Sequence, residues 1–141
     1  MHLQKHLALI DQPKHQFNFM SEIIQKVKNL SIGFRSKKDE EILILRNIST
    51  NIKKGETVGI VGESGSGKST LALAMMGYVK QGLYTINGEC LFESSNLLKK
   101  NNRELEKIRG RKIAMIPQNA GQSLTPNLKI GYQIDEALKL H

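Results

Sequence analysis

One segment restricts the fold of this chain more than any other. It is the nine-residue stretch Gly62 to Thr70, which reads GESGSGKST. The apolar run TVGIV at 57–61 precedes it, and STLALAMMGYV at 69–79 follows it with apolar residues at helical spacing. The run at 57–61 is typical of a strand buried on both faces of a parallel sheet. A strand, a glycine-rich loop and a helix in this order predict an α/β fold around a phosphate-binding loop.

The residue types in this loop suit a polyphosphate group. Glycines let the backbone curl so that successive N–H groups point inward, and the positive end of the following helix faces the same point. Lys68 adds a full charge for the outer phosphates, and Ser69 offers a hydroxyl to a magnesium ion. The alternative is that these residues are ordinary turn glycines beside a surface lysine. The predicted strand before the loop and helix after it disfavour this alternative. The predicted ATP contacts are Gly62, Glu63, Ser64, Gly65, Ser66, Gly67, Lys68, Ser69 and Thr70.

The remaining elements are expected from β-branched runs, turn residues and apolar spacing. Two antiparallel strands are predicted before the loop, in 23–34 and 42–52. Gly77 is predicted to end the helix that follows the loop. Further along, the sequence predicts a strand around a turn at 84–92, a polar helix at 101–109, a short buried strand at 112–116 and a helix at 130–140.

The first 21 residues read as an extension that precedes the domain at 22–141. They are polar and lack a sustained period, so we expect them to be poorly ordered, and Met20 is an alternative start of the protein. His2 and His6 share a helical spacing but have no further metal-ligand residue nearby, which favours a frayed tail over a metal site. The apolar patch 7–10 is too short for a secretory signal, and the single cysteine, Cys90, can form no internal disulfide. A cytoplasmic location is the default expectation.

The formal net charge of +8 raises the question of nucleic-acid binding. The basic residues gather in one stretch: Lys99, Lys100, Arg103, Lys107, Arg109, Arg111 and Lys112. Two acids interrupt this stretch, and no aromatic residue is interleaved for base stacking. A solvated surface is therefore the favoured interpretation, and no nucleic-acid partner is expected.

Hydrolysis of ATP needs more than the loop. It also requires an acidic residue at the end of a second buried strand and a group that orients water. After the loop, Asp135 and Glu136 form the one Asp-Glu pair, but they fall in the segment with helical spacing and follow no aliphatic run. We therefore interpret the pair as part of a helix surface.

Three motifs in order resemble the first half of an ABC-transporter ATP-binding subunit. They are GESGSGKST, then IRGRKIAMIPQN at 108–119, then SLTPNLKIGYQIDEALKLH at 123–141. Within that family they are most similar to the cassettes that power uptake of dipeptides, oligopeptides or nickel. The resemblance covers about residues 22 to 141 and implies a phosphate-loop core, a small antiparallel β subdomain and the start of a helical subdomain.

The resemblance also assigns roles to two residues outside the loop. Gln118 matches the family's Q-loop glutamine, which contacts magnesium and the attacking water and relays contact with the membrane subunit. Phe34, near the end of the first strand, matches the aromatic residue that stacks on adenine. The implied cofactors are ATP and magnesium, the metal being held by Ser69 and Gln118.

The family assembles into a transporter, so the resemblance implies partners and a location. These are a second ATP-binding subunit, identical or paralogous, the transmembrane permease subunits and, indirectly, an extracytoplasmic substrate-binding protein. The location implied is peripheral, on the cytoplasmic face of the cell membrane.

Several parts of the family pattern do not appear in this sequence. It contains no LSGGQ-like signature, no aliphatic strand that ends in Asp-Glu and no switch histidine, because His141 does not match that context. We therefore expect a truncated, catalytically incomplete ATP-binding subunit. The alternatives are a non-catalytic nucleotide-binding module or inactive remnant and, less favoured by the Q-loop match, another phosphate-loop enzyme such as a kinase.

Overall fold

A computed structural model describes residues 8–10, 22–116, 118–119, 121 and 124–140. The chain divides into two compact units, residues 1–100 and residues 101–141. The predicted pair His2 and His6 lies outside the described residues.

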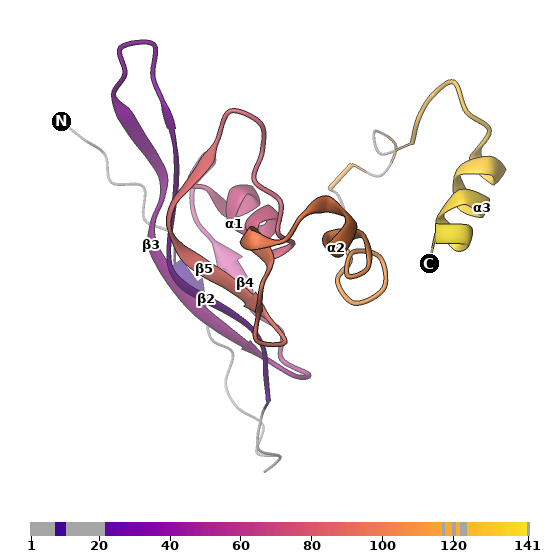
Figure 1. Cartoon of the computed structure of the whole chain (residues 1–141), viewed down its shortest axis with the longest axis horizontal. Helices are drawn as coiled ribbons and strands as arrows, with labels where there is room; N and C mark the ends of the chain where they lie inside the picture. The colour runs from indigo at the N-terminus through magenta and orange to yellow at the C-terminus, as the bar shows by residue number, and fades with distance from the viewer. Residues whose placement is uncertain (1–7, 11–21, 117, 120, 122–123, 141) are drawn as a thin grey trace. The chain divides into compact units, whose positions relative to one another are not determined.

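The first unit is built on a four-stranded antiparallel sheet with the order β3-β2-β5-β6 (Figure 1). The strands are β2 (Ile23–Arg35), β3 (Glu41–Lys53), β5 (Tyr84–Phe92) and β6 (Ser95–Asn96). β2 is the central strand, and in it Val27 lies opposite Thr50 of β3 and Cys90 of β5. The prediction of two antiparallel strands before the loop is confirmed.

The hydrophobic core lies between this sheet and helix α1 (Lys68–Met75), which packs against one face of the sheet (Figure 1). Burial of apolar side chains is the main source of folding free energy, so these contacts hold the helix that follows the loop in place. The fully buried members come from three strands and the helix: Val27, Leu30, Ile32, Leu45, Leu71, Ala74 and Cys90.

Gly77 ends α1, as the sequence predicts. Its φ of 73° is left-handed, and the N–H of Gly77 donates to the carbonyl oxygen of Ala74 at 2.9 Å. The N–H of Tyr78 donates to the carbonyl oxygen of Leu73 at 3.0 Å. These two bonds are the Schellman pattern, which satisfies the last carbonyl groups of a helix and favours glycine at this position.

The strand predicted at 84–92 is present, but the turn predicted within it is not, because β5 runs continuously from Tyr84 to Phe92. Gly88 has a φ of 93°, and a Cβ atom added there would lie 2.5 Å from the carbonyl oxygen of Asn29 and from Leu30 Cα. The pairing of β2 with β5 shifts register between Lys28 and Ser31, at this same place. The glycine therefore serves a close approach of two strands at a bulge, where a side chain would not fit.

The strand expected at 57–61 also differs from the prediction. It is β4 (Gly59–Val61), and it pairs antiparallel with β1 (Ala8–Ile10) instead of joining a parallel sheet. Gly59 and Val61 are exposed and Ile60 is half-buried, so the strand is not buried on both faces. The physical reason is that β4 has one hydrogen-bonded neighbour among the described strands. β1 also shows that the predicted extension contributes regular structure at these three residues.

The second unit contains α2 (Asn102–Glu106) and α3 (Ile130–Leu140), and the 3-10 helix η1 (Leu97–Lys99) ends the first unit. A capping box begins α2: the Asn101 side chain accepts from the N–H of Glu104, and the Glu104 carboxylate accepts from the N–H of Asn101, both at 3.0 Å. This reciprocal pair satisfies two N–H groups that the helix itself leaves free. The predicted helices at 101–109 and 130–140 are therefore both present, the first shorter than expected.

The buried strand predicted at 112–116 is not present. Ile116 is 93% exposed, and the β-type pairing of this stretch in the described part of the chain is an isolated bridge between Ile113 and Arg109. An apolar run becomes a buried strand only when neighbouring strands satisfy its backbone and cover its side chains. No helix in the described ranges is long and apolar enough to cross a membrane.

Candidate functional site

The phosphate-loop residues form a tight turn that leads directly into α1. The N–H of Ser66 donates to the carbonyl oxygen of Glu63 at 3.1 Å, which closes a β-turn. Gly65 and Gly67 have φ values of 75° and 95°, in the left-handed region that glycine adopts without steric cost. Gly65 and Gly67 therefore occupy positions where the backbone conformation favours glycine.

Lys68 folds back over the beginning of the loop. Its Nζ atom donates hydrogen bonds to the carbonyl oxygens of Gly62 at 2.8 Å and Glu63 at 2.7 Å. Hydrogen bonds from an ammonium group are stronger than neutral ones, so they hold the loop closed around the charge. The one full positive charge of the motif is thus fixed at the loop instead of extending into solvent.

The N-terminus of α1 is well suited to an anion. Gly67 is the N-cap and offers no side chain to the helix, and the first turn carries no acidic residue. The first N–H groups of a helix have no carbonyl partner within it, and the helix dipole is positive at this end. Ser69 is exposed in the first turn, where its hydroxyl is accessible. The helix end, the hydroxyl and the Lys68 charge meet within consecutive residues.

The C-terminal end of the loop is anchored to the core. A Cβ atom on Gly67 would lie 2.8 Å from Leu45 Cδ2 and 3.2 Å from the carbonyl oxygen of Ile44, so the loop passes directly over β3. Leu71, one turn into the helix, is fully buried. Ser66 is 7% exposed, and its hydroxyl oxygen has no hydrogen-bond partner among the described residues. The loop is therefore rigidly placed where it meets the helix.

These features fit a nucleotide polyphosphate with magnesium. The left-handed glycines and the uncapped start of α1 offer backbone N–H donors, and Lys68 adds an ammonium group that is held in place. The first turn of α1 carries no acidic side chain. The hydroxyl of Ser69 is the side-chain group of the loop that would help to hold magnesium. The described residues contain no group of three or more His, Cys, Asp or Glu side chains that could bind a metal without such a ligand.

The other predicted site residues fall in both units. Phe34 is half-buried near the end of β2, opposite Ile42 of β3, in the same unit as the loop. Gln118 is exposed and belongs to the second unit. Their roles in adenine stacking and in contact with magnesium and water stay predictions from the resemblance.

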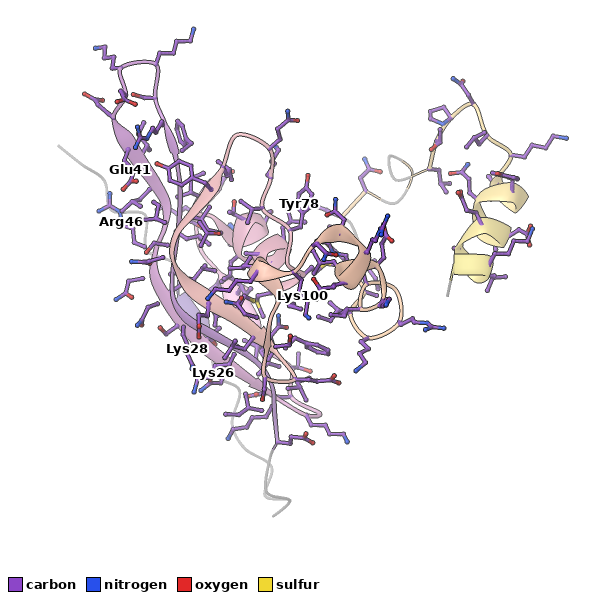
Figure 2. All side chains as sticks on the ribbon, viewed as in Figure 1. Lys26, Lys28, Glu41, Arg46, Tyr78 and Lys100 are labelled. Atoms are coloured by element: carbon purple, nitrogen blue, oxygen red, sulfur yellow. The ribbon has the colours of Figure 1, made fainter. Side chains whose placement is uncertain are left out.

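The acidic pair and most residues of the basic stretch are exposed, as predicted for a solvated surface. Asp135 and Glu136 are exposed on α3, and Asp135 forms an ion pair with Lys139 four residues later. Figure 2 shows exposed basic side chains on the four-stranded sheet as well, with Lys28 on β2 and Arg46 on β3. In the basic stretch, the exposed residues are Lys99, Arg103, Lys107, Arg111 and Lys112.

Cys90 is unsuited to act as a nucleophile. It is fully buried in β5, and this burial raises the pKa of its thiol to about 11. A hydrogen bond from Gln25 Nε2 to Sγ, at 3.6 Å, acts in the opposite direction and is the weaker effect. Because the thiolate is the reactive form, the protonated thiol serves packing.

Sequence reasoning missed the residues that support the loop from outside the motif. Ile44 and Leu45 lie under Gly67, and β1 pairs with the strand that enters the loop. The apolar patch 7–10 was the available signal for β1, but it carries no indication of which strand it would join. Contacts between residues so far apart in sequence leave no periodic pattern.

The sequence matches a known protein family over most of its length. The family model described as "ABC transporter" matches residues 45–139, which is more than half of the chain. The dipeptide transport ATP-binding protein of Lactococcus lactis subsp. cremoris (strain MG1363) is 42% identical over 120 residues, covering 85% of this chain and 34% of the relative.

Two further relatives have related names. The oligopeptide transport ATP-binding protein of Bacillus subtilis (strain 168) is 40% identical over 123 residues, covering 82% of this chain and 32% of the relative. The glutathione import ATP-binding protein of Salmonella paratyphi A (strain ATCC 9150 / SARB42) is 38% identical over 133 residues, covering 90% of this chain and 21% of the relative. The chain spans about a third or less of the length of these curated relatives.

Proposed function

Because the chain belongs to the ABC transporter family, we propose that residues 62–70 bind the phosphates of ATP with magnesium as part of an importer's ATP-binding subunit. The observation that carries this proposal is the loop itself. Lys68 Nζ is held 2.8 Å from the carbonyl oxygen of Gly62, and the uncapped N-terminus of α1 follows at once. A fixed cation beside a helix N-terminus is an arrangement that binds phosphate.

Each residue of the proposed site has a distinct task. The loop N–H groups and the ammonium of Lys68 hold the outer phosphates, and the hydroxyl of Ser69 contributes to magnesium binding. Phe34 stacks on the adenine ring. Gln118, by the family resemblance, would help to hold magnesium and to orient the attacking water, which would give it a direct part in hydrolysis.

The family couples ATP hydrolysis to transport, and we propose that this chain supplies only part of that chemistry. The sequence carries one phosphate loop and one Q-loop glutamine, and it lacks the acidic strand end and the signature that the family pattern requires. In this family the signature of a second ATP-binding subunit completes each phosphate loop, so this chain offers one half of one site. By itself the chain is expected to bind ATP without turning it over.

The proposed transport substrate is a peptide. Two of the relatives named above are described as dipeptide and oligopeptide transport proteins, and the third as a glutathione import protein. None of these three names refers to nickel, so the nickel alternative has no support from them. The proposed partners are a second ATP-binding subunit, transmembrane permease subunits and, indirectly, an extracytoplasmic binding protein. The proposed location is the cytoplasmic face of the membrane.

Titration calorimetry of the whole chain tests the nucleotide proposal. ATP with magnesium should bind, and adenosine should bind far more weakly, because the loop recognises phosphate. Equal affinity for the two ligands, or no heat of binding with ATP, would contradict the proposal. A phosphate-release assay on the same sample separates the binding and hydrolysis statements: sustained turnover by this chain alone would refute catalytic incompleteness.

A further inference from the structure

The two ends of the phosphate loop are held very differently. At its C-terminal end, Gly67 lies against β3, and α1 buries Leu71 in the core. At its N-terminal end, β4 has exposed residues on both sides of Ile60, which alone packs partly against the core. Backbone pairing of β4 in the described part of the chain comes from β1. We propose that residues Ala8–Ile10 are a positioning element that holds the N-terminal end of the phosphate loop in place.

The register of the pair supports this inference. Ala8 lies opposite Val61, Leu9 opposite Ile60 and Ile10 opposite Gly59. Val61 is the last residue of β4, and Gly62, the next residue, accepts one of the two hydrogen bonds from Lys68. A short strand without a hydrogen-bonded neighbour is not stable in water. Loss of β1 would therefore release the carbonyl groups that hold the Lys68 ammonium.

This inference rests on the proposed function only where it predicts a change in ATP affinity. Its structural statement is that order in the loop depends on a segment about fifty residues earlier, which can be measured without nucleotide. Hydrogen exchange reports local opening of a strand or loop separately from global unfolding. Amide exchange at Gly59–Val61 and at residues 62–66 is therefore the primary measurement.

The test variant is the full chain with both Ala8→Pro and Leu9→Pro. Hydrogen bonds alternate along an antiparallel pair, and proline lacks the N–H group, so two consecutive prolines remove a donor whichever of residues 8 and 9 is hydrogen-bonded. Their fixed backbone and rings further disfavour the paired strand. The control carries Gln4→Pro and Lys5→Pro, which precede Ala8–Ile10 in the sequence. A second control, Ala8→Val with Leu9→Val, keeps strand-forming residues and should behave as the natural sequence does.

We expect the strand variant to exchange amides at 59–66 at least about tenfold faster and to bind ATP at least about tenfold more weakly than either control. The core strands β2 and β5 should keep their protection, which distinguishes loss of position from loss of the fold. Unchanged exchange at 59–66 would overturn the inference, as would faster exchange with unchanged ATP affinity. If the natural chain does not bind ATP, the proposed function fails, and the exchange at 62–66 still decides the inference.

Discussion

The ammonium nitrogen of Lys68 lies 2.8 Å from the carbonyl oxygen of Gly62, six residues earlier, and this bond joins the two ends of the phosphate loop. A second bond to the carbonyl oxygen of Glu63 acts in the same way. Lys68 therefore both closes the loop and places a positive charge at it. Its charge is already near the loop before any phosphate arrives, so little side-chain ordering is left for binding.

Replacing Lys68 should separate this residue's contribution from the rest of the loop. Lys68→Ala removes a charge-assisted contact to phosphate, and we expect ATP affinity to fall at least about 100-fold, equivalent to about 2.7 kcal/mol. Calorimetry measures the change. Lys80→Ala, at an exposed lysine beyond α1, is the matched control and should leave the affinity unchanged. Unaltered binding in the Lys68 variant would rule out this loop as the phosphate site.

Gly67 should tolerate no side chain. In Gly67→Ala the new Cβ would lie 2.8 Å from Leu45 Cδ2, at a φ of 95°. We expect a loss of about 2–4 kcal/mol of unfolding free energy and weaker ATP binding, because both backbone strain and overpacking act there. Gly55→Ala shares a left-handed φ, 76°, but meets nothing within 4 Å. Urea unfolding gives the loss of unfolding free energy in each variant. Gly55→Ala measures the backbone strain alone, and the additional loss in Gly67→Ala measures the clash with β3. Equal losses in the two variants would show that the contact with β3 is unimportant.

Gly88 should be essential for the sheet and unimportant for phosphate chemistry. A Cβ atom there would meet three backbone atoms of Lys28, Asn29 and Leu30 at 2.5 to 2.6 Å. Backbone atoms cannot move aside as a side chain can, so Gly88→Ala should cost more than about 3 kcal/mol or prevent folding. Gly82→Ala, at a φ of 86° in open space, is the control for left-handed strain. Similar thermal midpoints for the two variants would contradict the close approach.

Cys90 should make the fold sensitive to alkaline pH. Burial raises the thiol pKa from its ordinary value of 9.0 to about 11, so the folded chain holds this proton more tightly than the unfolded chain. The resulting stabilisation is complete below about pH 9 and is lost as the pH rises through about 11, to a total of about 3 kcal/mol.

Denaturant unfolding between pH 8 and pH 11 measures this dependence. In Cys90→Ala the component that belongs to the thiol should disappear, and the variant's stability should fall less steeply over the same interval. A parallel decline in both proteins would assign the alkaline sensitivity to other groups.

The local elements could largely be predicted, because their signals are local. The glycines, the lysine and the hydroxyl of residues 62–70 follow one another along the chain, and the structure confirms the strand before them, the helix after them and its end at Gly77. The predictions that failed concern pairing. Residues 57–61 are predicted as a buried strand of a parallel sheet and residues 112–116 as a short buried strand, yet the first pairs antiparallel and the second is not a strand. An apolar run indicates that burial of the segment is favourable, but it does not indicate which strand the segment pairs with.

By itself, the sequence determined the family, the residue types of the loop 62–70 on which the phosphate proposal rests, and the start of the helix that follows. Each depends on residue types at fixed short spacings, which the chain carries regardless of its surroundings. Only the tertiary structure decided that β1 pairs with β4, that Gly67 lies over Leu45 and that Lys68 bonds to the carbonyl oxygens at the start of its own loop. These relationships arise from burial and from backbone pairing between segments distant in sequence, and such contacts become definite only when the chain folds.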